Sequence, residues 1–325
     1  MLPVIEIRIA NQEARMSFVG AVPDTGVRSV LLAFDFSEAS DTALHHALAI
    51  SRHYGAKFYL AHVVSHLGYT IAGPEALQLA AERTLRDAKQ LERELLESGA
   101  LAGLQYEFIV REGDVWEQLK VVIRQKQVDL VVTGTHGRGG LGKLLLGSTA
   151  EQIFRHADCL VDTVGPRSYK DSLVERTHAV RPFLFATDFG TASLRALPYA
   201  ISFANQFGAR FVVLHVLPAA PIPEGFHWSS TGDLMQMRDQ ARMACQKQFE
   251  ELILPHIPTA TKPEFVVQFG IPSEQILLAS HALEADLIFL GLNRSAHIGT
   301  ASHMPWAVAY KVVCGAHCPV LTIRN

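Results

Sequence analysis

Short apolar runs alternate with longer segments along the first half of the chain. The runs are rich in Val, Leu, Ile and Phe, which is typical of strands buried on both faces of a sheet. They cover residues 29–34, 58–64, 105–111, 130–133 and 160–164. Between the first two runs, apolar residues recur at spacings of three and four, which predicts a helix. The predicted helices cover residues 37–53, 74–98, 115–126 and 147–156.

This alternation predicts an α/β fold with a parallel, doubly wound sheet, because strand–helix–strand units form right-handed crossovers. The pattern then recurs as an internal repeat. Asp35 and Asp188 are 153 residues apart, and so are His62 and His215, each pair within a matching sequence block. The duplicated domain therefore predicts two tandem five-stranded sheets. The strand order 3-2-1-4-5 in each sheet is a further hypothesis.

The repeat also predicts the domain boundaries. Residues 1–27 have no counterpart in the second half and form an N-terminal extension. The two copies span residues 28–166 and 181–325. Residues 167–180 are polar and charged with little periodicity, so we interpret them as the linker between the copies.

Composition and charge narrow the class of partner. The 325 residues are 49% apolar and carry a net charge of −3, which gives no electrostatic signature for nucleic acid or an anionic membrane. No apolar stretch approaches the roughly 18 residues that a membrane span requires. Four cysteines do not form a disulfide framework, so we expect a cytoplasmic protein in a reducing compartment.

A glycine-rich segment follows the fourth predicted strand and leads into a helix. It runs from Gly134 to Thr149 and includes Gly137, Gly147 and Ser148. Glycines let the backbone approach a ligand closely, and the start of a helix offers unpaired N–H groups to phosphate. The segment has no Gly-Lys-Ser/Thr sequence, so it is not a Walker A loop.

The position of this segment supports a ligand site. In doubly wound sheets, ligands bind beyond the carboxyl ends of the strands where the strand order reverses. With the order 3-2-1-4-5, Asp35 after the first strand and Gly134 after the fourth face the same crevice. An aspartate there accepts hydrogen bonds from a base or a ribose hydroxyl, although it also suits a cap of the following helix.

The chain resembles the universal stress protein family in its tandem form. The resemblance rests on the motif Gly-x2-Gly-x9-Gly-Ser/Thr, together with the first-strand Asp35 and the closing Cys-Pro-Val-Leu-Thr-Ile at residues 318–323. It covers roughly residues 28–325 and implies a Rossmann-like fold of the adenine nucleotide α-hydrolase-like group. In that family the motif marks members that bind ATP.

The resemblance also implies site residues. Ala33, Asp35 and Val63 lie at the adenine end in this reading. The residues implied to bind the ribose and phosphates are Gly134, Gly137, Gly147, Ser148 and Thr149, with a further nucleotide contact from Thr133. Mg²⁺ or Mn²⁺ accompanies the phosphates. The fifth strands, residues 160–164 and 320–323, pair within one molecule as a pseudo-dimer, and a homodimer is also plausible.

The second half departs from the motif. Gly291 is kept, but Arg294 stands where the second glycine belongs, and no Gly-Ser pair precedes the helix. Pro305 removes a backbone donor from that region. We therefore expect a degenerate second site that does not bind ATP in the family manner.

Several readings stay open for function. The leading one is a nucleotide-dependent stress-response protein with at most slow ATP hydrolysis and no catalytic residue assigned. A nucleotide-independent dimerising scaffold is one alternative. The other is an adenylyl-transfer enzyme of the same fold group, although the turn at Asp35 lacks the sequence motifs of such enzymes. His62 and His215 lie in apolar strands and read as core histidines.

Overall fold

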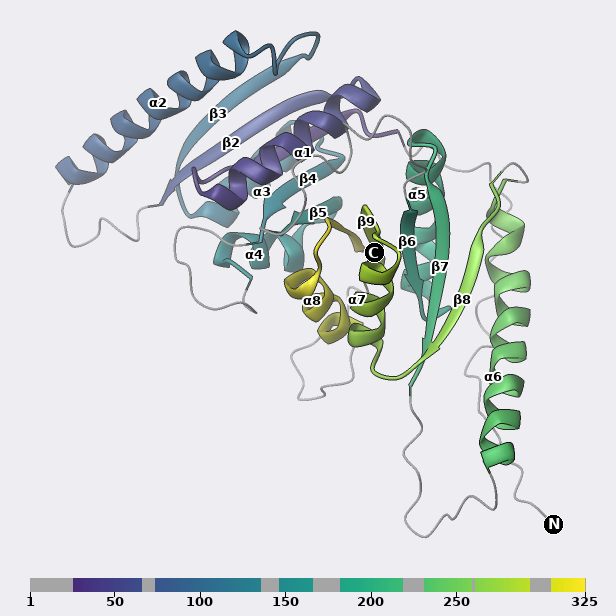
Figure 1. The fold of residues 1–325 in the computed structure, drawn as a ribbon. Helices are drawn as coiled ribbons and strands as arrows, with labels where there is room; N and C mark the ends of the chain where they lie inside the picture. Colours follow the sequence, from purple (N-terminus) through teal and green to yellow (C-terminus); the bar gives the residue numbers. More distant parts are fainter. Residues whose placement is uncertain are drawn as a thin grey trace.

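A computed structural model gives the fold (Figure 1). It describes residues 26–65, 74–135, 146–165, 182–218, 231–258, 261–292 and 305–324. The first half alternates strictly between strands and helices. Its elements are β1 (Ser29–Ala33), α1 (Glu38–Tyr54), β2 (Lys57–Ser65), α2 (Pro74–Glu97), β3 (Tyr106–Gly113), α3 (Val115–Gln125), β4 (Leu130–Gly134), α4 (Ser148–His156) and β5 (Leu160–Val164).

The second half repeats this order, with one short 3₁₀ helix added. Its elements are β6 (Pro182–Thr187), α5 (Thr191–Gln206), β7 (Arg210–Leu217), α6 (Thr231–Leu252), η1 (Leu254–His256), β8 (Glu264–Phe269), α7 (Pro272–Ala282), β9 (Leu287–Leu292), α8 (Pro305–Gly315) and β10 (Val320–Arg324). The predicted elements of the first half agree with the observed ones to within two residues at each end.

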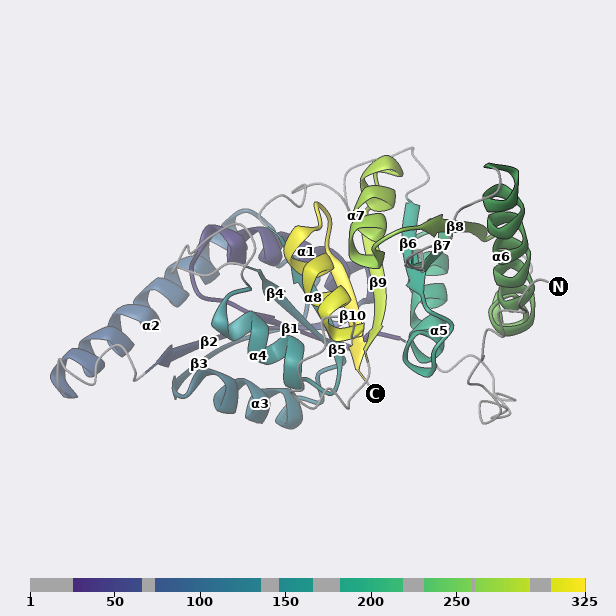
Figure 2. The ribbon, with the colours of Figure 1, turned by 90° about the horizontal axis from the view of Figure 1, so that it is seen from below.

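The strands of both halves join in one ten-stranded sheet of order β3-β2-β1-β4-β5-β10-β9-β6-β7-β8. Each half has the predicted order 3-2-1-4-5, and its strands are parallel. The halves meet where β5 pairs with β10, which confirms the predicted pairing of the fifth strands, and the structure adds that this pair is antiparallel. Figure 2 shows β10 beside β5 and β9, and Figure 1 shows α2 and α6 at opposite ends of the sheet.

Alternating side chains divide the core between the two faces of the sheet. On β1, Val30 and Leu32 pack on the face covered by α1, whereas Leu31 packs on the other face with residues of α3 and α4. The α1 face is continuous across both halves and includes residues of α5 and α6. His53 of α1 stacks on Phe207 after α5, with ring centroids 3.9 Å apart. The two halves therefore share one core on this face.

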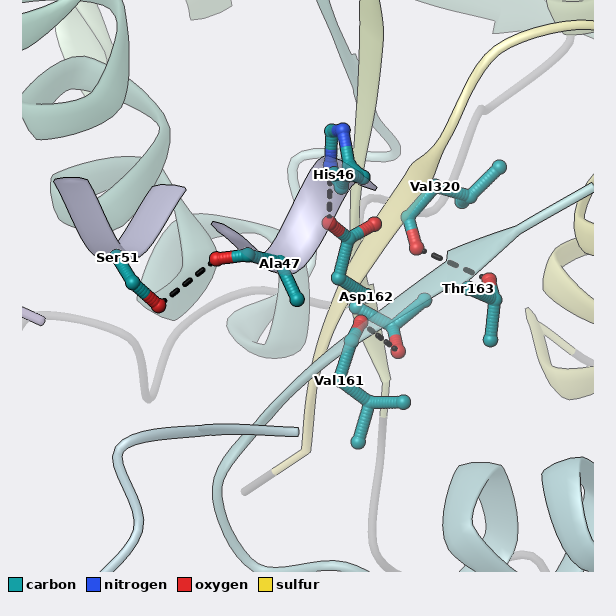
Figure 3. A network of polar contacts seen from close by, with 8 residues as sticks. His46, Ala47, Ser51, Val161, Asp162, Thr163 and Val320 are labelled. Atoms are coloured by element: carbon teal, nitrogen blue, oxygen red, sulfur yellow. Dashed lines mark hydrogen bonds and ion pairs between the residues drawn. The ribbon is translucent and has the colours of Figure 1, made fainter. Parts of the chain in front are cut away.

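A polar network lies at the junction of the halves (Figure 3). His46 Nε2 of α1 lies 2.6 Å from Asp162 Oδ2 of β5, and both side chains are buried. Asp162 is in register with Leu321 of β10. Next to it, Thr163 Oγ1 donates to the Val320 carbonyl at 3.0 Å. A charged group is thus buried in the strand that joins the two halves.

Candidate functional site

The carboxyl ends of β1, β2 and β4 bring together the residues expected at the adenine end. Ala33 is in register with Thr133 on one side and with Ala61 on the other, and Val63 follows two residues later on β2. Ala33, Thr133 and Val63 are all buried or nearly so. Because β1 and β4 flank the point where the strand order reverses, these residues lie where the topology favours a ligand.

Asp35 holds the turn that leads into α1. Its Oδ1 accepts hydrogen bonds from the Ser37 amide at 3.0 Å and from the Ser40 hydroxyl. Ser37 in turn caps α1 by accepting from the Ser40 amide. Phe36, between them, has a φ of 61°, a left-handed conformation that non-glycine residues rarely adopt. Asp35 therefore braces the turn before α1, whereas the cap that the sequence suggested for it is made by Ser37; the Asp35 side chain is half-buried.

Gly134 lies against protein as well as at the predicted crevice. A Cβ at Gly134 would lie 2.9 Å from both the carbonyl carbon and the carbonyl oxygen of Ala39 in α1. The absence of a side chain therefore lets the end of β4 pack directly on the first turn of α1. This contact gives Gly134 a structural requirement that the glycine-loop motif alone did not reveal.

The two described ends of the glycine-rich segment meet each other. The Gly147 amide donates to the Thr135 carbonyl at 2.7 Å, and the Thr135 amide donates to the Val164 carbonyl. Helix α4 then begins at Ser148, with Gly147 as its N-cap and no side-chain cap. Ser148 is exposed and Thr149 half-buried. Gly137 lies outside the described residues.

The start of α4 therefore has the properties that an anion site requires. The first N–H groups of a helix have no partner within the helix, and the helix dipole adds a partial positive charge there. The Gly147–Thr135 hydrogen bond fixes this helix start beside the end of β4. Within the described part of the chain, no group of metal-ligating side chains is present.

The second half repeats the turn chemistry of the first. Asp188 Oδ1 accepts from the Gly190 amide and from the Ser193 hydroxyl, both at 2.8 Å. Phe189 repeats the positive φ of Phe36, at 57°. A Cβ at Gly291 would lie only 2.2 Å from a carbonyl oxygen of α5, so this glycine is also required for packing. Arg294, on which the degenerate site was predicted, lies outside the described residues.

Both strand histidines are bound to backbone carbonyls, as expected for core histidines. His62 Nδ1 contacts the Phe34 carbonyl at 2.7 Å, and His215 Nδ1 contacts the Thr187 carbonyl at 2.8 Å. Burial lowers the pKa of His215, and the Thr187 carbonyl and the Asp188 carboxylate offset part of that shift. A carbonyl only accepts, so Nδ1 carries the proton, and Nε2 of the neutral ring is an acceptor.

A cavity of about 360 Å³ lies at the carboxyl ends of β6, β7 and β9, beneath α7 and α8. Its lining residues are Ala186, Thr187, Asp188, Ser193, Leu214, His215, Val216, Pro218, Pro272, Ile276, Leu290, Gly291, Val308 and Ala309. The sequence reading treated these positions as core or as remnants of a degenerate site and did not find the cavity. The duplicated Asp188 and His215 were the only signal for it.

Comparisons with known proteins agree with the fold. A family model described as the universal stress protein family matches residues 26–164 and 179–324. A universal stress protein of Mycolicibacterium smegmatis is 24% identical over 306 residues, which cover 91% of this chain and 96% of that protein. A universal stress protein of Methanocaldococcus jannaschii is 25% identical over 135 residues, covering 41% of this chain and 79% of that protein.

Solved structures show the same architecture. The crystal structure of a universal stress protein from Archaeoglobus fulgidus superposes with a TM-score of 0.62 at 18% identity, covering 92% of this chain and 98% of that one. At this identity the likeness concerns the fold alone. In the part of the chain that the structure describes, no helix is long and apolar enough to cross a membrane.

Proposed function

The chain belongs to the universal stress protein family, a family of stress-response proteins, and from that premise we propose that its first half binds ATP or another adenine nucleotide. The observation that carries the proposal is the junction of β4 and α4. There the Gly147–Thr135 hydrogen bond holds an uncapped helix start at the end of β4, one of the two strands that flank the strand-order reversal. Base, ribose and phosphates need these features in this order along one crevice.

Each group of the nucleotide has a proposed partner. Ala33 and Val63 offer apolar contacts to the base, with Thr133 beside them, and Asp35 accepts from a base amine or a ribose hydroxyl. The phosphates meet the N-terminal amides of α4 and the hydroxyls of Ser148 and Thr149, with Gly137 added from the family motif. Mg²⁺ or Mn²⁺ enters with the phosphates and neutralises part of their charge.

The proposed activity is binding that signals nucleotide status rather than rapid turnover. A water molecule attacking a phosphate needs a general base within hydrogen-bond reach. Asp35, the carboxylate at the crevice, already accepts two hydrogen bonds through Oδ1. We therefore propose at most slow hydrolysis. The four cysteines are free thiols, which fits a protein of the reducing cytoplasm.

The test is nucleotide binding by the full chain and by two hydroxyl variants. Bound small molecules are first identified by mass spectrometry after denaturation of the purified protein. ATP with Mg²⁺ is then titrated by calorimetry into the full chain and into two variants. The first is Thr149→Val, at the start of α4, and the second is Thr191→Val. The second is the control, because Thr191 is an exposed threonine at the start of α5, a helix that like α4 has a glycine N-cap and no side-chain cap.

We expect Thr149→Val to weaken ATP binding by roughly 10-fold or more, since a hydrogen bond to a charged group contributes about 1.5–3 kcal/mol. Thr191→Val should bind like the original chain. Absence of both a released nucleotide and a binding heat would overturn the proposal. Gly134 is a poor position for this test, because any side chain there meets the backbone of α1.

A further inference from the structure

The cavity of the second half has the size and position of a small-molecule site. It lies at the carboxyl ends of β6 and β9, the neighbouring strands at which the order of the second half reverses. Its volume of about 360 Å³ falls at the lower end of the range for ligand pockets, which is roughly 300–1,000 Å³. Two helices, α7 and α8, contribute Ile276 and Ala309 to its wall.

The walls of the cavity are mostly apolar. Leu214 and Val216 of β7, Leu290 of β9 and Val308 of α8 supply aliphatic surface. Small side chains, including Ala186 and Ala309, leave the space between the sheet and the helices unfilled. Such a wall suits the face of a compact ring system rather than a polar chain.

The polar groups of the lining accept hydrogen bonds and carry no positive charge. Asp188 is the only Asp, Glu, Lys or Arg among the lining residues. Its Oδ1 is engaged by the turn, whereas within the described part of the chain Oδ2 has no donor. The neutral ring of His215 adds the acceptor Nε2. The hydroxyls of Thr187 and Ser193 are already bonded to each other.

The lining residues favour uncharged ligands that donate hydrogen bonds over ligands that carry a phosphate group. A ligand with N–H or O–H donors gains a charge-assisted hydrogen bond to Asp188, which is stronger than a neutral one. The described lining residues include no Lys or Arg, so they offer no charge compensation to a phosphate group.

We propose that this cavity binds a phosphate-free nucleoside, with the ring against the apolar wall and a ring or sugar donor on Asp188. The inference rests on the proposed function, because the duplication places Asp188 at the position of Asp35. The molecule then carries two unlike sites on one sheet. The first takes a nucleotide, and the second takes the uncharged nucleoside and excludes the nucleotide.

The test measures binding of adenosine and of ATP to the full chain by calorimetry. Ala309→Leu fills the cavity, and Asp188→Asn removes the charge while leaving an oxygen to accept from the turn. Gly147→Val serves as the matched variant of the first site. We expect Ala309→Leu and Asp188→Asn to weaken adenosine binding by roughly 10- to 100-fold and to leave ATP binding unchanged. Circular dichroism confirms that each variant is folded.

The outcomes separate this inference from the proposed function. Loss of ATP binding in Gly147→Val with adenosine binding retained supports both. Adenosine binding that is lost in Gly147→Val but kept in both cavity variants assigns adenosine to the first site and overturns the inference. Absence of adenosine binding with intact ATP binding also overturns it. ATP competing for the Asp188-dependent site refutes the exclusion of phosphate. Adenosine binding that depends on Asp188, without any ATP binding, refutes only the proposed function.

Discussion

Replacing His46 by leucine removes the partner of a carboxylate that is fully buried at the junction of the two halves. The side chain of Asp162 is 0% exposed, and its Oδ2 lies 2.6 Å from His46 Nε2. Within the described part of the chain, Oδ1 has no hydrogen-bond partner. Breaking a buried pair on one side costs about 3–5 kcal/mol, because the remaining charge keeps its desolvation penalty and loses its compensation.

Two further variants separate the cost of losing the hydrogen-bond partner from the cost of burying the charge. Asp162→Leu leaves a buried neutral imidazole, for which the loss of one hydrogen bond costs about 1–3 kcal/mol. The double variant His46→Leu/Asp162→Leu removes both polar groups. Apolar replacement of a whole buried pair is often neutral or stabilising. We therefore expect the double variant to be more stable than His46→Leu by several kcal/mol.

Urea denaturation followed by circular dichroism measures these differences. The midpoint should fall most for His46→Leu and recover in the double variant, at a similar dependence on urea. If His46→Leu lowers the free energy of unfolding by less than about 1 kcal/mol, His46 does not stabilise the buried carboxylate of Asp162. If the double variant is as unstable as His46→Leu, the cost arises from packing around position 46 rather than from the unpaired carboxylate.

Three further predictions concern turns and the second half. Gly134→Ala should destabilise the fold by about 1–3 kcal/mol through overpacking against α1. Gly291→Ala should cost more, because its Cβ would lie 2.2 Å from the backbone of α5, whereas the Cβ at Gly134 would lie 2.9 Å from that of α1. Thermal melts rank the two variants. Ser37→Ala should cost about 0.5–2 kcal/mol by removing the cap of α1, and equal stability to the original chain in urea would contradict that role. Burial lowers the pKa of His215 in the folded state, so the unfolded chain binds more protons below about pH 6.5 and the folded state loses stability as the pH decreases. His215→Gln should reduce this loss of stability between pH 7.5 and 5.5. An unchanged pH dependence in the variant would argue against this role of His215.

The secondary structure and strand order could be predicted because both follow from local pattern and from the repeat. Short apolar runs bounded by turn residues located the strands of the first half, and the alternation with helices required parallel pairing. The pairing of residues 160–164 with 320–323 followed from the family resemblance, whereas its antiparallel direction did not. These features could be predicted because they depend on local sequence pattern, on the repeat or on the resemblance, and not on particular side-chain contacts.

The rest depends on which side chains meet in space. Asp162 within an apolar strand signals that a partner exists, but 116 positions separate it from His46. The sequence assigned Gly134 to a ligand, whereas its contact with the first turn of α1 appears only when β4 and α1 are docked. The cavity beside Asp188 is a space that side chains leave unfilled, and such a space has no direct signal in the sequence. Residues such as Ala309 have the pattern of core residues, and only the packed structure shows that they line a cavity.

The pairing of β5 with β10 has a consequence for how copies of this chain recognise one another. Asp162 and Leu321 are register partners, and they are also each other's counterparts in the repeat, 159 residues apart like Cys159 and Cys318. The local twofold axis of the junction therefore passes between an acid and an aliphatic residue. Two first halves joined symmetrically would place two carboxylates face to face in a dry core, which is strongly unfavourable. Symmetric pairing of two first halves through this edge is therefore disfavoured, and pairing with the second half, which places Leu321 opposite Asp162, is favoured.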